Sequence, residues 1–241
     1  MLNIFNIVLL TLVSASIGTM TGFGTSTIMV PVLSFFLPIP QTLLFVGIIH
    51  WFGDIWKMLF FKKGFNWKLI ILFGIPGIIT SFLAASLPIT LPELLLQRSL
   101  GLFLVLYVAF LFFAPNWKMK ASNSGALLGG TLSGFFSGIF GVGGAIRSTF
   151  LTAFDLPKSV FLFTSGVIGL LIDSSRLSQY LLSNIKLNSS LTKTLILCIP
   201  VSFLGAFIAK KLVDKIPQKS FRLFITFALF LVGLRYLLLS S

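Results

Sequence analysis

Two groups of ionisable side chains stand at helical spacing inside apolar segments of this sequence. Their members are His50, Asp54 and Lys57 in the first segment, and Asp173, Arg176 and Tyr180 in the second. Residues three, four or seven positions apart share one helix face, so each group presents its charges together. Charged side chains within an apolar helix face a protein interior or a cavity and pair there. The spacing therefore predicts one ion pair within each group, Asp54 with Lys57 and Asp173 with Arg176.

The chemistry available to these groups is gating or ion coupling. His50 is the only histidine in the chain, and an imidazole can change its charge near neutral pH. It is a candidate proton relay, with a hydrogen-bonded histidine at a helix interface as the alternative. Asp54 and Asp173 have two alternative roles: each could carry a proton directly, or each could be only a structural ion-pair partner. Lys57 has the further alternative of extending to the membrane surface.

Arg147 is a separate candidate, one helical turn after a glycine cluster at 141–144. A buried arginine is costly in a membrane and is a functional candidate by default. Its planar guanidinium suits a two-point contact with a carboxylate, sulfonate or phosphate. We predict contact with an anionic substrate or a gating role. The alternative is a salt bridge with Asp173 or another acidic residue that holds helices together.

Glycines break one apolar stretch in each half of the chain, at 16–27 and at 133–147. Lipid cannot satisfy the backbone groups that such a break leaves free, so a break belongs where protein or a water-filled cavity surrounds it. Breaks at matching positions of two halves are typical of the substrate site of a secondary transporter. The substrate-binding residues predicted within the breaks are Gly22, Gly24, Thr25, Ser26, Gly141, Gly143 and Gly144.

Each break also predicts the start of a half-helix, near 25–27 in the first and near 143–144 in the second. The first turn of a helix exposes unpaired N–H groups and the positive end of the helix dipole. Two such ends facing each other near the bilayer centre can bind an anion. The hydroxyl groups of Thr21, Ser26 and Ser137 could add donors. The alternative is that these small residues only permit close helix crossing.

The composition places the chain in a membrane. Of 241 residues, 56% are hydrophobic and 10% are charged, with a mean hydropathy of +1.06, whereas soluble domains carry about 25% charged residues. The net charge of +13 comes mostly from residues between apolar spans, which is the pattern of cytoplasmic loops rather than of a nucleic-acid-binding surface. We predict a multi-pass membrane protein whose partners are the bilayer and a small anion.

Several segments have the length of a membrane helix, for which about 20 apolar residues are needed. They are 42–61, 67–87, 94–114, 159–181, 191–209 and 221–239. The two broken stretches, 4–37 and 124–154, are each too long for one span. Each is either a hairpin of two short helices or one full helix followed by a half-helix or a second, tilted span. The segment 1–18 is interpreted as a retained first membrane segment, because no Lys or Arg precedes its apolar core.

The order of motifs repeats along the chain. A glycine cluster, an apolar half-helix and a proline follow one another in 18–40 and again in 134–157. We predict an all-α fold in a single membrane domain with two repeated halves, 1–117 and 121–241. Each half would contain a glycine-broken first segment and three transmembrane helices.

The basic residues favour an inverted arrangement of the halves. If each broken stretch returns to the side from which it started, most basic residues fall on one side, which the positive-inside rule makes cytoplasmic. These residues are Lys57, Lys62, Lys63, Lys68, Lys118, Lys120, Lys158, Lys210, Lys211, Lys215, Lys219 and Arg222. The opposite side keeps Arg98, Lys186, Lys193 and Arg235.

No enzyme constellation is found in the sequence. One histidine and Cys198, the single cysteine, cannot make a typical structural zinc site. There is no Gly-Lys-Ser/Thr phosphate loop and no paired nucleophile and base. We therefore predict no catalytic residue, no metal and no cofactor.

The motifs resemble those of the sulfite exporter TauE/SafE family, also called the toluene-sulfonate uptake permease group. The segments that carry the resemblance are Gly22 to Pro31, Phe140 to Ser148, Asp173 with Arg176 and Tyr180, and His50-Trp51 with Lys57. The resemblance covers nearly the whole chain. It implies a cell-membrane carrier with two repeated halves that moves small sulfur-containing anions such as sulfite, sulfonates or sulfoacetate.

This chain departs from that family's pattern at two places. Thr25-Ser26-Thr27 stands where many members have more glycine, and Arg147-Ser148 stands where many have an apolar residue and a proline. The expected function is secondary transport by alternating access, driven by a proton or substrate gradient. A passive anion channel is the first alternative, and an intramembrane enzyme or an assembly factor is the second. The sequence leaves homo-oligomerisation open.

Overall fold

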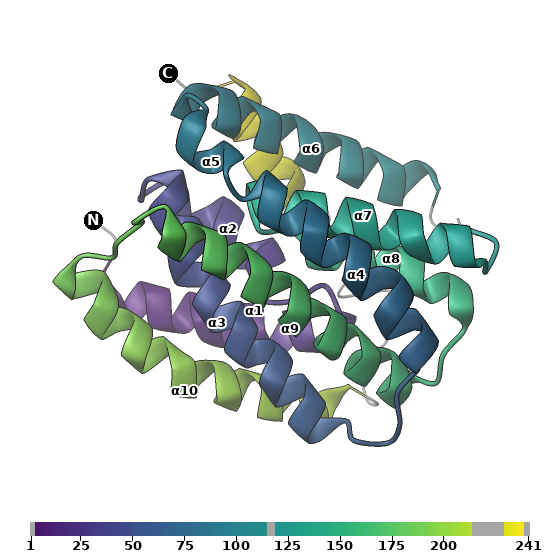
Figure 1. The fold of residues 1–241 in the computed structure, drawn as a ribbon. Helices are drawn as coiled ribbons and strands as arrows, with labels where there is room; N and C mark the ends of the chain where they lie inside the picture. The colour runs from purple at the N-terminus through teal and green to yellow at the C-terminus, as the bar shows by residue number, and fades with distance from the viewer. Residues whose placement is uncertain (1–2, 115–118, 214–228, 239–241) are drawn as a thin grey trace.

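The structure is a computed structural model that describes residues 3–114, 119–213 and 229–238 (Figure 1). The described residues form helices and connecting turns, as the sequence predicts, and contain no strand. The helices are α1 (Ile4–Thr21), α2 (Ser26–Leu33), α3 (Ile39–Phe60), α4 (Trp67–Ala84), α5 (Leu87–Thr90), α6 (Glu93–Phe113), α7 (Asn123–Phe140), α8 (Gly143–Leu151), the 3-10 turn η1 (Thr152–Phe154), α9 (Lys158–Leu182) and α10 (Ser189–Leu212). A further apolar helix covers Leu229–Leu238.

Local signals in the sequence explain where several helices begin. The side chains of Asn66, Ser122 and Asn188 accept hydrogen bonds from backbone N–H groups in the first turns of α4, α7 and α10, as N-cap residues do. Helices α3 and α9 each start directly after a proline, Pro38 and Pro157. Proline disfavours helical conformation in the residue before it, so each proline separates a long helix from the chain that precedes it.

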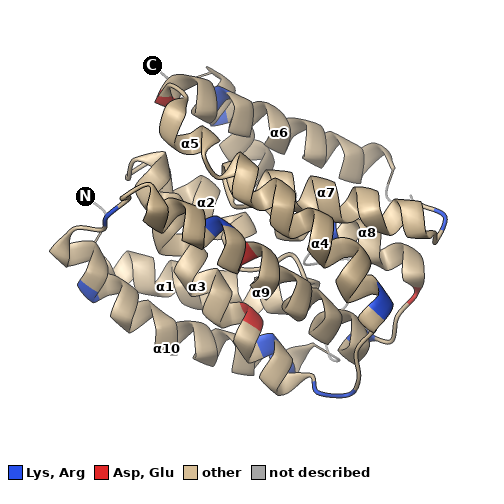
Figure 2. Cartoon of the chain, viewed as in Figure 1, with Lys and Arg blue, Asp and Glu red and all other residues tan. Residues whose placement is uncertain are grey.

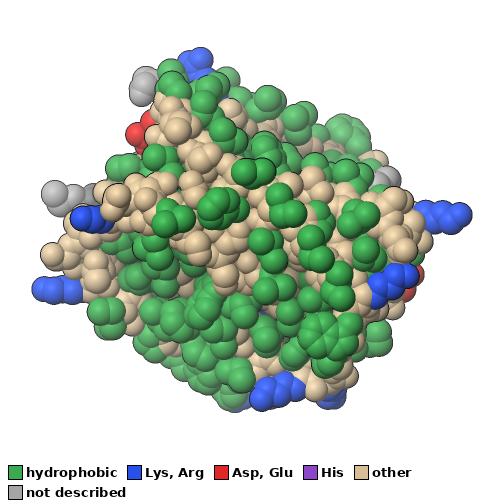
Figure 3. Space-filling view, in the orientation of Figure 1, with side chains coloured by type: hydrophobic (Ala, Val, Ile, Leu, Met, Phe, Trp, Pro, Cys, Tyr) green, Lys and Arg blue, Asp and Glu red, His purple; other side chains and the backbone are tan. Residues whose placement is uncertain are grey.

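Within the described chain, six helical segments have the length and hydropathy of membrane spans. They are α1, α3, the segment Trp67–Thr90 that joins α4 and α5, α6, α9 and α10. Large apolar side chains such as Ile75, Leu83 and Ile196 are exposed on these helices, and apolar side chains cover much of the visible face (Figure 3). The multi-pass membrane prediction is confirmed. The predicted span 221–239 lies partly outside the described residues.

Both broken stretches consist of a full-length helix followed by a short one. Helices α1 and α7 have 18 residues each, which corresponds to about 27 Å, whereas α2 and α8 have 8 and 9 residues. The chain turns at Gly22, Gly24 and Gly141, whose φ angles of 77°, 84° and 69° are left-handed and favour glycine. The breaks therefore exist where the glycines predict them. The hairpin of two short helices is not the form that the chain adopts.

Small residues allow the long helices to approach closely. Helix α7 packs along α4, and α1 packs along α10. Gly130 lies against the backbone of Phe73, and Gly134 lies against the backbone of Gly77. Close crossing is thus the role of the glycines inside α7, as one alternative proposed, while the glycines at 141–144 form the break itself.

Most Lys and Arg residues lie at the ends of helices (Figure 2). Lys63, Lys158 and Lys210, which the sequence places on one side of the membrane, line one cavity and so do lie together. Four residues of the same predicted group, Lys118, Lys215, Lys219 and Arg222, lie outside the described residues. Lys57 is buried and does not extend to the surface.

Candidate functional site

The two predicted ion pairs are present in the interior of the helix bundle. Lys57 Nζ pairs with Asp54 Oδ1 on α3. Arg176 Nε donates to Asp173 Oδ1 on α9 at 2.8 Å. All four side chains are at most 1% exposed. Helices α3 and α9 pack against each other, so the two pairs face a common interior.

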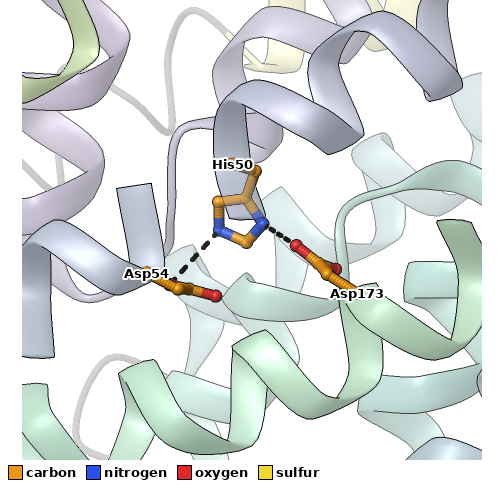
Figure 4. Close-up of side chains that lie close together, drawn as sticks. All are labelled: His50, Asp54 and Asp173. Carbon is orange, nitrogen blue, oxygen red and sulfur yellow. Dashed lines mark hydrogen bonds and ion pairs between the residues drawn. The ribbon is translucent and has the colours of Figure 1, made fainter. Parts of the chain in front are cut away.

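His50 joins the two pairs. Its Nδ1 atom lies 2.6 Å from Asp173 Oδ2, and its Nε2 atom lies 3.9 Å from Asp54 Oδ1 (Figure 4). Ser137 Oγ of α7 also donates to Asp173, at 3.3 Å. Among the described residues Nε2 has no hydrogen-bond partner. The imidazole therefore lies between two carboxylates, one from α3 and one from α9.

The same three residues offer ligand atoms within 4.8 Å of one another. This geometry alone would allow a metal ion. However, Lys57 and Arg176 already pair with the two carboxylates, and a metal ion would have to displace or repel these cations. We therefore interpret the trio as part of an ion-pair network.

Arg147 reaches the network from α8. It is 1% exposed, and its Nε donates to Ser165 Oγ of α9 at 3.0 Å. Its Nη2 atom has no hydrogen-bond partner in the described chain. No salt bridge of Arg147 with Asp173 or another acidic residue occurs among the described residues. Asp173 interacts with Arg176 and His50 instead.

Gly169 of α9 makes room for two charged groups. A Cβ atom built on Gly169 would overlap Asp54 Oδ2 and lie 2.7 Å from Arg147 Nη2. Gly166, one turn earlier, lies against the backbone oxygen of Asp54. The carboxylate of α3 and the guanidinium of α8 thus meet at the bare backbone of α9.

Both breaks in the broken stretches touch this network. The first break comprises residues 22–25, and the second comprises residues 141–144, of which Gly143 and Gly144 begin α8. A Cβ on Gly24 would overlap His50 Nε2, and a Cβ on Gly141 would lie 3.2 Å from Arg176 Nη1. The breaks also touch each other, because Ser148 Oγ donates to the Gly22 carbonyl oxygen and Gly144 lies against the Phe23 carbonyl oxygen.

The predicted half-helix starts are observed at Ser26 and Gly143. Of the three hydroxyls considered as donors, Thr21 Oγ1 bonds to Ile17 O and Ser137 Oγ bonds to Asp173. Ser26 Oγ is buried without a hydrogen-bond partner in the described residues. Ser26 is therefore the hydroxyl that remains available at the site.

Comparisons with known proteins show to which family the chain belongs. A model of the family "Sulfite exporter TauE/SafE" matches residues 7–236. The chain belongs to the TauE/SafE family. It is also similar to a protein of Methanocaldococcus jannaschii named a probable membrane transporter protein, with 26% identity over 246 residues that cover 92% of this chain and 91% of that protein. No solved structure matches the chain.

Membership of this family makes the chain a membrane transporter and not an enzyme. Thr25, at the first break of this TauE/SafE chain, is buried and precedes α2 as its N-cap residue. Tyr180 was predicted to gate or couple transport. Its hydroxyl donates to the Gly138 carbonyl oxygen at 2.6 Å, which ties α9 to α7.

Sequence reasoning missed two residues at this candidate site, Ser165 and Gly169, and noted Ser148 only as a departure from the family pattern. A signal existed for Gly169, because it stands four residues before Asp173 and so shares its helix face. Ser165 gave no such signal, since its partner Arg147 lies on another helix. Trp51 Nε1 likewise donates to Ser174 Oγ at 2.8 Å, which links α3 to α9 beside the network.

Proposed function

We propose that this TauE/SafE chain is a secondary transporter that moves a small anion by alternating access. Sulfur-containing anions such as sulfite and sulfonates are the proposed substrates. The observation that carries the proposal is a buried excess of positive charge at the place where the two breaks meet.

The excess follows from the partners of the three buried cations. Asp54 offsets Lys57, and Asp173 offsets Arg176. Arg147 makes its hydrogen bond to a neutral serine hydroxyl, and no ion pair of Arg147 occurs within the described residues. The Asp54 carboxylate also borders Gly169 beside Arg147, but Lys57 already pairs with it. A buried charge without a counter-charge is costly. A bound anion would neutralise Arg147 and lower that cost.

The available donors suit an oxyanion. Arg147 Nη2 and both Nη atoms of Arg176 lack hydrogen-bond partners in the part of the chain that is described. Gly144 lies near the first of these guanidinium groups and Gly141 near the second. Guanidinium N–H groups make short, charge-assisted hydrogen bonds to sulfonate-like and carboxylate oxygens. Substrate contact therefore involves the residues of both breaks together with Arg147.

The starts of α2 and α8 add backbone donors. The first N–H groups of a helix have no partner within the helix, and the helix dipole favours negative charge there. The N-terminal residues of α8 lie against the first break, so both helix starts lie beside one region. Such paired helix starts serve anion substrates in transporters built from repeats.

The packing of the helices supports two repeated halves, 1–117 and 121–241. The first helix of each half packs on a long helix of the other half: α1 packs on α10, and α7 packs on α4. Helices α2 and α8 contact each other, as do α3 and α9. Contacts of this kind are expected when a two-fold axis relates the halves. Movement of one half against the other would expose the site alternately.

The ion-pair network is the proposed gating and coupling device. His50 touches the first break through Gly24, and Arg176 touches the second break through Gly141. A proton on His50 would alter its interaction with Asp54 and Asp173, and so would alter both breaks. Lys57 holds the Asp54 carboxylate on α3, and Tyr180 ties α9 to α7 through Gly138.

Anion flux into proteoliposomes tests the binding site. Purified protein is reconstituted, and uptake of labelled sulfite and of a small sulfonate is measured. A pH-sensitive dye inside the liposomes reports proton movement at the same time. We expect Arg147→Ala to reduce flux at least about tenfold, because one charge-assisted hydrogen bond contributes about 1.5–3 kcal/mol. Arg147→Lys keeps the charge but loses the planar contact, so we expect an intermediate value.

Arg98→Ala is the matched control, because it removes an exposed arginine of α6 far along the chain from the site. Its flux should equal that of the unchanged protein. Unchanged flux in Arg147→Ala, with intact folding by gel filtration and thermal unfolding, would reject the assigned site. Substrate flux without any linked ion movement would indicate a passive channel instead.

A further inference from the structure

Three lysines from different parts of the chain converge on a cavity at the end of the helix bundle. The cavity has a volume of about 290 Å³ and is lined by Phe60, Phe61, Lys63, Lys158, Ser159, Lys210 and Val213. Lys63 follows α3, Lys158 begins α9 and Lys210 lies in the last turn of α10. None of these described lining residues is acidic. The cavity therefore concentrates positive charge from three helix ends.

We propose that this cavity binds the phosphate group of an anionic phospholipid headgroup. Lys63 and Lys210 provide the ammonium donors and the charge that a phosphate requires. Lys158 Nζ donates to the carbonyl oxygen of Val213, another lining residue. Ser159 adds a hydroxyl to the lining. The volume is close to the lower end of small-molecule pockets, about 300 Å³, which fits a headgroup and not a whole lipid.

The surface beside the cavity is suited to acyl chains. Phe60, which lines the cavity, packs on Phe203 and Phe207 of α10 with ring centroids 5.3 and 6.0 Å apart. Both α10 rings are 37% exposed, and Leu204 between them is 53% exposed. Lys210 Nζ lies 5.3 Å from the Phe60 ring centroid. The charged cavity thus continues into an apolar surface of a membrane-spanning helix.

A free anion on its way to the transport site is the competing occupant. Phe61 and Val213, which line the cavity, belong to a buried apolar cluster with Met20 and Leu162. Lys57, the member of the ion-pair network nearest to Phe61 along α3, is itself buried one turn before it. The exposed apolar side chains of α10 beside the cavity favour a lipid headgroup over a passing substrate.

Lipid binding to the purified full-length protein tests the proposal. Delipidated protein in detergent is titrated with phosphatidylglycerol and with zwitterionic phosphatidylcholine, and complexes are counted by native mass spectrometry. The test variant is Lys63→Gln/Lys210→Gln, and the matched control is Lys186→Gln/Lys193→Gln. The control removes two exposed lysines predicted for the opposite side of the membrane.

We expect the unchanged protein and the control to prefer phosphatidylglycerol. The test variant should bind it about 30-fold more weakly, given about fivefold per lysine near a lipid headgroup. Equal losses in the two double variants would show general surface attraction and overturn the proposal. Equally tight, lysine-dependent binding of inorganic phosphate or sulfite alone would also overturn it, because the cavity would then take a free anion. Arg147→Ala should retain lipid binding, so this result is independent of the transport site.

Discussion

Gly169→Ala tests the placement of the charged groups with a single methyl group. The added Cβ would overlap Asp54 Oδ2 and lie 2.7 Å from Arg147 Nη2, whereas ordinary van der Waals contacts begin at 3.4 Å. Both charged groups would have to move away, Arg147 by about 0.7 Å and Asp54 by more. Overpacking of a well-packed interior costs about 1–3 kcal/mol.

That strain can have two effects. If the helices shift and carry the charged groups away from Gly169, packing worsens and the free energy of unfolding falls by about 1–3 kcal/mol. If only the two side chains turn away, the proposed anion site is distorted, and the same energy appears as about 5- to 150-fold lower flux. We expect the second outcome to dominate, because the guanidinium of Arg147 has a neutral hydroxyl as its described partner and can turn away from Gly169.

The assay is flux of labelled sulfite or sulfonate in proteoliposomes, combined with thermal unfolding in detergent. Gly74→Ala is the matched control, because its Cβ would meet only Leu171 Cδ1, at an ordinary 3.5 Å. That substitution should leave flux unchanged and should stabilise α4 by about 0.5–1 kcal/mol. If Gly169→Ala transports and unfolds like the unchanged protein, Asp54 and Arg147 do not hold the positions that the site requires.

Two further predictions concern the ion-pair network. Asp173→Asn leaves Arg176 as a buried charge without its carboxylate, and we expect a loss of about 3–5 kcal/mol in stability. The double variant with Arg176→Gln should recover much of that loss in a double-mutant cycle measured by chemical unfolding, and additive losses would show that the two residues do not interact. His50→Gln keeps a hydrogen-bonding side chain of similar reach but cannot carry a proton at neutral pH. We expect folded protein whose anion flux is no longer accompanied by proton movement, and proton movement at the original ratio to substrate would exclude His50 as the carrier.

Features that depend on local spacing could be predicted from the sequence. The pairs Asp54–Lys57 and Asp173–Arg176 are three residues apart, and a helix brings such residues together whatever the rest of the chain does. The turns at Gly22 and Gly141 were predictable for a related reason. A left-handed backbone conformation favours glycine, and glycines are conspicuous within an apolar stretch.

Features that depend on distant contacts could not be predicted in the same way. His50 and Asp173 are separated by 123 positions along the chain, and no spacing rule links them. Arg147 had several acidic and polar residues as conceivable partners, and packing of α8 against α9 selected Ser165. Hydropathy also left open whether the first helix of each broken stretch was short or full-length. Hydropathy indicates which residues suit the membrane, but it does not indicate where the chain turns.

The amino-acid sequence by itself determined the membrane location, the helical class, the two breaks and the charged helix faces. These follow from composition and from periodicities of a few residues, which operate within a single helix. Only the tertiary structure decided that both breaks, His50 and the guanidinium groups of Arg147 and Arg176 share one buried region. These groups come together because helices from both halves pack closely. Glycines have no side chain, so charged groups of one helix can lie directly against the backbone of another. Burial then leaves one positive charge without an ion pair among the described residues, and this arrangement is the basis of the anion site that we propose.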